Sequence, residues 1–158
     1  MEHLFLRNVS SGDMEGVFAL SNEDYVRQYS VNKERITWEE HVRWFTNILQ
    51  DRDNVFYVIT DHSERFLGQI RYRIENDNAI VSISLSNLIM GKGLSRQLLL
   101  ESINKLFQER KEIKVIIAYV SENNIASDKL FKKAGFFLED KQQELLKYIY
   151  PETSTSVN

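Results

Sequence analysis

Two glycines flanking a lysine, in the segment LSNLIMGKGLSRQLL over residues 85–99, carry the clearest chemical signal in this chain. The chain has only six glycines, and Gly91 and Gly93 lie between an alternating run and an apolar-periodic one. Small residues before a helix let backbone N–H groups fold around phosphate oxygens, and the helix dipole adds about half a positive charge. Lys92 adds a cation. The segment therefore predicts either a tight strand-to-helix turn or a phosphate-binding loop.

Two familiar phosphate motifs do not match this segment. A dinucleotide fingerprint needs a third glycine, and the spacing places Arg96 there. A P-loop needs a glycine four residues before Gly-Lys-Ser/Thr, and both that glycine and the Ser/Thr are missing. The triplet alone leaves the plain turn and the phosphate loop open.

Composition and charge exclude several classes of function. A net charge of −3 without a basic stripe argues against a nucleic-acid partner. The apolar run VIIAYV is too short to cross a bilayer, and the first ten residues lack the apolar core of a signal peptide. The absence of cysteine excludes disulfides and fits a cytoplasmic protein. No cluster of residues has metal-ligand spacing, so no metal is expected.

The elements that must position the glycine loop follow from hydrophobic period and capping signals. Strands are expected in HLFLRNV, NVFYVITD, RFLGQIRYRIEN, DNAIVSISLS, KVIIAYV and QELLKYIY. Helices are expected from Asp13 through MEGVFALSNED, in TWEEHVRWFTNIL behind a Thr37–Glu40 capping box, after the glycines, and in NNIASDKLFKKAGF. YVRQYSVNKERI has no clear period and is expected to be a loop. In the capped helix, Trp38, Val42, Phe45 and Leu49 recur at helical spacing.

This order predicts a mixed α/β fold with helices on both faces of a central sheet of about six or seven strands. Residues 1–150 are expected to form a single domain, with 151–158 as a flexible C-terminal tail.

Two motifs about 30 residues apart resemble the GNAT superfamily of acetyl-CoA-dependent N-acetyltransferases. The first is MGKGLS, set between the strand ending SISLS and a helix, against the family pattern Arg/Gln-x-x-Gly-x-Gly/Ala. Met90 stands at the Arg/Gln position, Gly93 matches, and Ser95 replaces the second small residue. The second is NIASDKLFKKAGF, which offers Asn124, Ser127, Phe131, Gly135 and Phe136 against Asn-x-x-Ala/Ser-x-x-x-Tyr-x-x-x-Gly-Phe.

The resemblance implies acetyl-CoA as co-substrate and a set of residues that bind it. In the family, the strand before the glycine loop parts from its neighbour, and its free amides meet the thioester and pantetheine. Here those amides are on Ile83 and Leu85, with Ile83 N–H facing the developing oxyanion. The implied cofactor-binding residues are Ile83, Leu85, Met90, Gly91, Lys92, Gly93, Leu94, Ser95 and Asn124.

Proton transfer has no clear donor or base in this sequence. The family's usual acid is a tyrosine at the position of Phe131, and phenylalanine cannot donate a proton. Water, Tyr119 or Ser84 could substitute. Some relatives place a glutamate where Ala79 stands here, and nearby Glu75 and Asp77 are expected to be surface acids. Deprotonation through water remains open.

The N-terminal third resembles the acceptor-binding region of N-acetyltransferases for nucleotide-linked amino sugars, of the pseudaminic-acid and spore-coat polysaccharide type. The resemblance implies substrate contacts from Asn22, Arg27, Ser30, His41 and Trp44. Trp38 and Phe45 belong to the same pattern and to the helix stripe, which favours a core role. A structural or pocket-lining His41 is favoured over a catalytic one, and His3 and His62 are expected at the surface.

The expected partner is therefore a small-molecule amine, and the sequence leaves room for a homodimer. Two alternatives stay open: acetylation of protein N-termini, as in enzymes acting on ribosomal proteins, and a non-catalytic acyl-CoA-binding module. Met90 and Phe131 favour the last.

Overall fold

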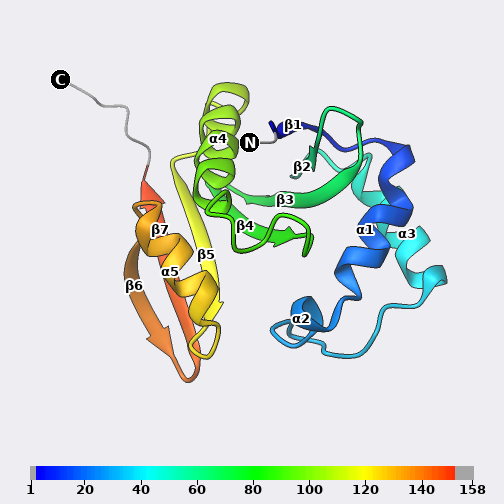
Figure 1. Ribbon diagram of the computed structural model, residues 1–158. Helices are drawn as coiled ribbons and strands as arrows, with labels where there is room; N and C mark the ends of the chain where they lie inside the picture. The colour runs from blue at the N-terminus through cyan, green and yellow to red at the C-terminus, as the bar shows by residue number, and fades with distance from the viewer. Residues whose placement is uncertain (1–2, 152–158) are drawn as a thin grey trace.

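The computed structural model describes residues 3–151, and they form a mixed sheet of seven strands between two layers of helices (Figure 1). The order across the sheet is β1-β2-β3-β4-β5-β7-β6. Only β4 and β5 are parallel, and all other neighbours are antiparallel. The strands are β1 Phe5–Asn8, β2 Asn54–Thr60, β3 Phe66–Glu75, β4 Asn78–Leu85, β5 Val115–Ser121, β6 Phe137–Gln142 and β7 Leu145–Pro151.

The helices cover both faces of the sheet, which confirms the expected architecture. They are α1 Met14–Ser21, α2 Asp24–Arg27, α3 Trp38–Ile48, α4 Ser95–Glu109 and α5 Ile125–Lys133, with a short 3-10 turn at Ser11–Asp13. The larger core lies under α4 and α5 and includes Leu99, Ile103 and Leu106. A smaller core forms where α1 and α3 meet β2, around Val17 and Phe45. Because successive side chains of a strand point to opposite faces of the sheet, those of β2 enter the two cores in turn.

Three local expectations need correction. The segment taken as a loop after residue 24 begins with the short helix α2. The polar run FLEDKQ forms β6, because it pairs with β7 in a hairpin at the sheet edge although all its side chains are exposed. The buried face of α3 is made by His41, Phe45 and Ile48. Trp38 begins the helix, lies edge-on to Phe18 at 5.1 Å between ring centroids, and stays 43% exposed.

The capping signals correctly mark the start of α3 and the end of α5, whereas the helix expected from Asp13 through Asp24 ends at Ser21. The Thr37 side chain accepts from the Glu40 N–H at 3.2 Å, and the Glu40 carboxylate accepts from the Thr37 N–H at 3.0 Å. Gly135 follows α5 with a φ of 101°, a backbone conformation that favours glycine. Helix α3 packs in the smaller core through Phe45, and α5 packs in the larger core through Phe131.

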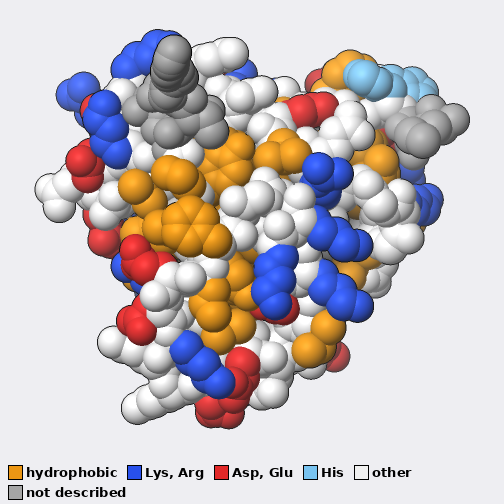
Figure 2. Space-filling view, turned by 90° about the vertical axis from the view of Figure 1, so that its left-hand side faces the viewer, with side chains coloured by type: hydrophobic (Ala, Val, Ile, Leu, Met, Phe, Trp, Pro, Cys, Tyr) orange, Lys and Arg blue, Asp and Glu red, His pale blue; other side chains and the backbone are white. Residues whose placement is uncertain are grey.

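The side of the molecule formed by the β6–β7 hairpin and α5 carries a group of hydrophobic side chains beside basic ones (Figure 2). On the hairpin, Phe137, Leu138 and Leu145 are each about half exposed. Among residues 3–151, no helix has the length and apolar character needed to cross a membrane. The tail expected over 151–158 lies outside the described residues, apart from Pro151, which ends β7.

Candidate active site

The parallel strands β4 and β5 separate partway along their length, and this separation creates the site. They pair only at Asn78–Val115, Ala79–Ile116 and Ile80–Ile117. Beyond Ile80, β4 turns with β3 toward α1, while β5 runs with β7 in the other direction (Figure 1). The second half of β4 therefore has a free edge.

The free edge of β4 presents the two amides that the sequence predicts. The Ser86 N–H donates to the Leu67 carbonyl of β3 at 2.8 Å. Because N–H directions alternate along a strand, the N–H groups of Ile83 and Leu85 face away from β3, into the gap. The Leu85 carbonyl faces the same way and accepts from the Tyr25 hydroxyl at 2.8 Å. The gap thus carries unpaired backbone donors at the spacing that an extended ligand requires.

The glycine loop lies at the end of this edge. Gly91 and Gly93 have φ angles of 73° and 72°, and a Cβ built on either would meet nothing within 4 Å. The positive φ, and not crowding, is what calls for glycine here. Helix α4 begins directly afterwards at Ser95, with no side-chain cap on its first N–H groups. A loop in this conformation with uncapped amides fits the diphosphate of acetyl-CoA.

The loop continues into a shallow groove of about 450 Å³ along the exposed face of α4. Gly93, Arg96, Gln97, Leu100, Glu101 and Asn104 line it. Arg96 connects α4 to α5, because its Nε–H donates to the Lys133 carbonyl at 3.0 Å.

The predicted residues on the β5 side have mostly structural contacts. Asn124 is the N-cap of α5, and its Oδ1 accepts from the Ser127 N–H at 3.2 Å. Phe131 is only 4% exposed and packs edge-on against Phe136 at 5.0 Å between centroids. Tyr119 is 47% exposed on β5, beyond the last residue that pairs with β4.

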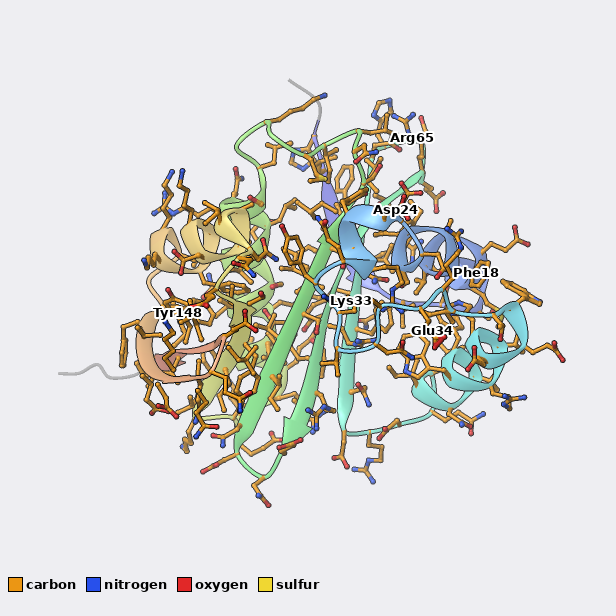
Figure 3. All side chains as sticks on the ribbon, turned by 90° about the horizontal axis from the view of Figure 1, so that it is seen from below. Phe18, Asp24, Lys33, Glu34, Arg65 and Tyr148 are labelled. Atoms are coloured by element: carbon orange, nitrogen blue, oxygen red, sulfur yellow. The ribbon has the colours of Figure 1, made fainter. Side chains whose placement is uncertain are left out.

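A second cavity of about 400 Å³ lies on the other side of β4, where the acceptor would approach. Its walls come from α2, α3 and the loop between them, and its floor comes from β3 and β4. Figure 3 shows this loop, marked by Lys33 and Glu34, on the same side of the strands as α1 and α3, with Tyr148 on the opposite side of the molecule. The lining residues are Ser21, Val26, Arg27, Ser30, Asn32, Glu34, Arg35, Ile36, Glu40, His41, Trp44, Gln69, Arg71, Ser82 and Ser84.

Four of the five predicted substrate residues line this cavity: Arg27, Ser30, His41 and Trp44. Asn22 does not. Its side chain is buried, with the amide nitrogen donating to the Ile36 carbonyl at 2.9 Å and the amide oxygen accepting from the Ile36 N–H at 2.7 Å. Both ends of the Asn22 amide are used, so its observed contacts anchor the cavity wall.

His41 connects α3 to α1 as well as lining the cavity. Its ring is 1% exposed, and its Nε2 lies 2.8 Å from the Met14 carbonyl. Burial lowers the pKa of His41, and the Met14 contact opposes that shift. A neutral imidazole that donates to a carbonyl satisfies both conditions. His3 and His62 are exposed, as expected.

On the sheet floor of the cavity, three residues were not anticipated from the sequence: Gln69, Arg71 and Ser82. They share one face of the sheet with Ser84, since Gln69 pairs with Ser84 and Arg71 pairs with Ser82 across β3 and β4. Their neighbours in sequence, among them Ile70 and Val81, point into the main core. The alternation of polar and apolar residues in both strands was the signal that could have found them.

The acids near the β3–β4 turn lie away from the gap. Glu75 and Asp77 are exposed at the end of the hairpin where β4 still pairs with β5. Glu75 forms an ion pair with Arg73. Both are surface acids, as expected, and Ala79 is buried. In residues 3–151, no group of three or more histidine or acidic side chains is arranged to hold a metal ion.

Comparison with known proteins places this geometry in a family. A model of the acetyltransferase (GNAT) domain matches residues 3–137. The chain is 24% identical over 143 residues to acetyltransferase PseH of Campylobacter jejuni, covering 86% of this chain and 84% of PseH. It is 27% identical over 146 residues to an uncharacterized protein of Methanocaldococcus jannaschii, covering 89% of this chain but only 29% of that longer protein.

Solved structures share the fold. Spermidine N-acetyltransferase of Vibrio cholerae, in complex with CoA and spermine, superposes with a TM-score of 0.85 at 18% identity, covering 95% of this chain and 96% of that one. A domain from M. jannaschii superposes with a TM-score of 0.82 at 23% identity, covering 96% and 100%. Acetyl-CoA is the co-substrate of GNAT enzymes, and the parted strands and glycine loop fit it. The chain therefore belongs to the GNAT family of acetyltransferases.

Proposed function

We propose that this chain transfers the acetyl group of acetyl-CoA to the primary amine of a small molecule, a nucleotide-linked amino sugar. The observation that carries the proposal is the free edge of β4, with one cavity ending on its polar face and the glycine loop at its end. We include a cytoplasmic location of the reaction in the proposal.

In this mechanism the backbone of β4 supplies the main catalytic interaction. The Ile83 N–H is positioned to donate to the thioester oxygen as negative charge develops on it, and loss of such a donor typically costs about 10²–10³ in rate. The amine nitrogen, arriving from the cavity side, bonds to the carbonyl carbon, and the carbon–sulfur bond breaks. The amine releases its proton and the departing sulfur ends as a thiol.

The proposal assigns proton transfer to water and hydroxyls. Phe131 has no ionisable group, and a thiol with a pKa near 8.5 leaves without strong acid assistance. Ser84 lines the cavity directly beside the edge of β4, and Tyr119 lies on the facing strand. Either hydroxyl, or a water held by it, is the proposed donor.

The cavity supports an amino-sugar acceptor over the alternatives. Trp44 provides an aromatic wall, and Arg27 and Arg71 provide cationic groups. A polyamine, as in the V. cholerae neighbour, would meet these cations. A protein N-terminus would have to pass the loop that Asn22 holds down at Ile36.

The test is acetyl-CoA-dependent thiol release with a panel of amines: a UDP-linked 4-amino sugar, spermidine and short peptides. The proposal expects turnover on the sugar and little on the others. Turnover only on peptides would establish N-terminal acetylation instead. Binding of acetyl-CoA without turnover on any amine would favour the non-catalytic module.

We include a homodimer in the proposal, formed through the hairpin. Strand β6 is a fully exposed sheet edge, and Phe137 and Leu138 are apolar on it. Exposed strand edges of this kind are templates for pairing with another chain. A V. cholerae neighbour is itself described as dodecameric.

A further inference from the structure

The floor of the acceptor cavity holds polar groups that have no protein partner, and it spans β3 and β4, on the β4 side of the gap. Gln69 and Arg71 of β3 lie side by side with Ser84 and Ser82 of β4. All four line the cavity. The distance of each of these side chains from the gap determines which part of a bound acceptor it can contact.

Gln69 carries a hydrogen-bond acceptor with nothing bound to it. Its side chain is 9% exposed, and its Oε1 is buried without a partner. Its Nε2 donates to the Ser21 hydroxyl at 3.4 Å, which leaves the oxygen as the free end. A buried amide oxygen without a donor costs about 1–3 kcal/mol, so its retention calls for an N–H or O–H donor from outside the chain.

Arg71 carries a cation without an acidic partner. Its guanidinium carbon lies 4.8 Å from the ring centroid of Trp44 and 5.8 Å from that of Phe56. None of the ion pairs formed within residues 3–151 includes Arg71. Stacking on Trp44 holds the guanidinium in place without using its N–H donors.

Arg27 is a second cation of the cavity, on the wall opposite Arg71. Its terminal nitrogens donate to the Glu34 carbonyl and the Ser30 hydroxyl, while its Nε is buried without a partner. Of the two carboxylates that line the cavity, that of Glu40 is already bound to the N–H and hydroxyl of Thr37. The free groups of the cavity therefore include donors and cations, the exposed carboxylate of Glu34 and one buried acceptor, Gln69 Oε1.

We infer that Gln69 and Arg71 select the acceptor: Arg71 binds an oxyanion of the amine substrate, and Gln69 Oε1 accepts a hydrogen bond from its amino group or a neighbouring hydroxyl. This inference rests on the proposed function and specifies its acceptor. Strand β3 is one strand spacing further from the gap than the edge of β4, about 4.8 Å. The reacting nitrogen and the oxyanion should thus lie roughly 5–10 Å apart in the same molecule.

The oxyanion side of the inference is tested with Arg71→Met. The control is Arg73→Met, the same change two residues along β3, where the side chain is exposed, pairs with Glu75 and does not line the cavity. With saturating acetyl-CoA, Arg71→Met should raise KM for a UDP-linked 4-amino sugar by about 10–100-fold, as loss of a charged hydrogen bond does. It should leave KM for acetyl-CoA unchanged, and Arg71→Lys should restore part of the loss.

The free 4-amino sugar, which lacks the diphosphate, distinguishes binding from structure. Its KM should change less than about twofold in Arg71→Met, because Arg71 has no oxyanion to bind there. An equal loss on both sugars, or no loss on either, overturns the role of Arg71. A free amino acid as acceptor tests a carboxylate source: if it alone responds to Arg71→Met, the oxyanion is a carboxylate. Preference of the unmodified protein for spermidine overturns the inference.

The role of Gln69 is tested with a substitution that should lower kcat/KM without lowering the melting temperature, a combination that a purely structural role would not produce. Gln69→Met removes the unpartnered oxygen at nearly constant volume. It should lower kcat/KM by about tenfold on both the UDP-linked and the free sugar, because the lost group contacts the part they share. The melting temperature should stay constant or rise, since a buried orphan acceptor is gone. Unchanged kcat/KM would overturn the role of Gln69.

Failure of the proposed function remains distinguishable from failure of this inference. If no amine is acetylated, calorimetric titration of the CoA-bound protein with UDP still measures the oxyanion site. Arg71→Met should weaken that binding about tenfold, and Arg73→Met should not. Equal UDP affinity in both variants and in the unmodified protein overturns the inference.

Discussion

In the proposed site, several residues contribute backbone groups, and others contribute one end of a polar side chain. In the proposed mechanism Ile83 and Leu85 contribute their amides, while their side chains pack against the core. Gly91 and Gly93 contribute a backbone conformation. Replacing such residues therefore tests geometry more than side-chain chemistry.

Gly93→Val should weaken acetyl-CoA binding while the domain stays folded. A branched residue at a φ of 72° costs about 1–3 kcal/mol and moves the loop out of its conformation, although nothing crowds its Cβ. We expect the dissociation constant to rise by about tenfold or more, measured by calorimetry. Gly12→Val is the matched control, since Gly12 has no positive φ and lies in the turn before α1. An unchanged constant in Gly93→Val would argue against the diphosphate loop.

Phe131→Tyr should leave kcat unchanged or raise it. The ring already packs on Phe136, and the added hydroxyl restores the group that the family usually carries at this position. Thiol release with the best acceptor measures the effect. A large fall in kcat would mean that the position serves packing alone, and the role transferred from the family would be wrong.

Helices and strands position these side chains through a few specific contacts. The wall of the acceptor cavity depends on Asn22, which ties the end of α1 to the residue before the α3 capping box. Asn22→Ala should destabilise the fold by about 1–3 kcal/mol. It should also raise the acceptor KM while leaving acetyl-CoA affinity unchanged. Asn47→Ala, on the exposed side of α3, is the control, and equal acceptor KM values in the two variants would contradict this role.

The contact between α1 and α3 gives the fold a pH dependence. Burial lowers the pKa of His41 in the folded chain. As the pH falls below about 6.5, the unfolded chain therefore binds a proton at this imidazole more readily than the folded chain does. Stability is therefore complete above about pH 6.5 and falls as the pH drops below it. His41→Gln should flatten the loss of melting temperature between about pH 7.5 and 5.5. The same change at the exposed His62 is the control. Parallel curves for all three proteins would contradict this effect.

The sequence predicted what depends on local pattern. The capping box, the glycine after α5 and the apolar faces of α4 are set within a few residues, and the structure confirms them. It missed β6 because FLEDKQ has no apolar alternation, and its pairing with β7 is what makes it a strand. Gln69 and Arg71 were missed because only the sheet brings them opposite α2 and α3. The substrate role of Asn22 was inferred from the resemblance, and its hydrogen bonds to Ile36, 14 positions away, leave no pattern in the sequence.

The molecule as a whole presents one long exposed edge at β6, which carries the proposed dimer. Phe137→Lys places a charge on that edge and should convert a dimer to a monomer by light scattering. Gln108→Lys adds the same charge on the exposed face of α4 and should leave the mass unchanged. A monomeric unmodified protein would refute the dimer.

The parting of β4 and β5 has a consequence for the energetics of the fold. Only three residue pairs join the two halves of the sheet, so the ladder is left incomplete where a further strand would normally complete it. An extended ligand bound between β4 and β5 contacts both halves of the sheet and stabilises them relative to one another. Acetyl-CoA at about 100 times its dissociation constant should add about 2.7 kcal/mol to the free energy of unfolding. Heat resistance can therefore report occupancy of the cleft before any acceptor is identified.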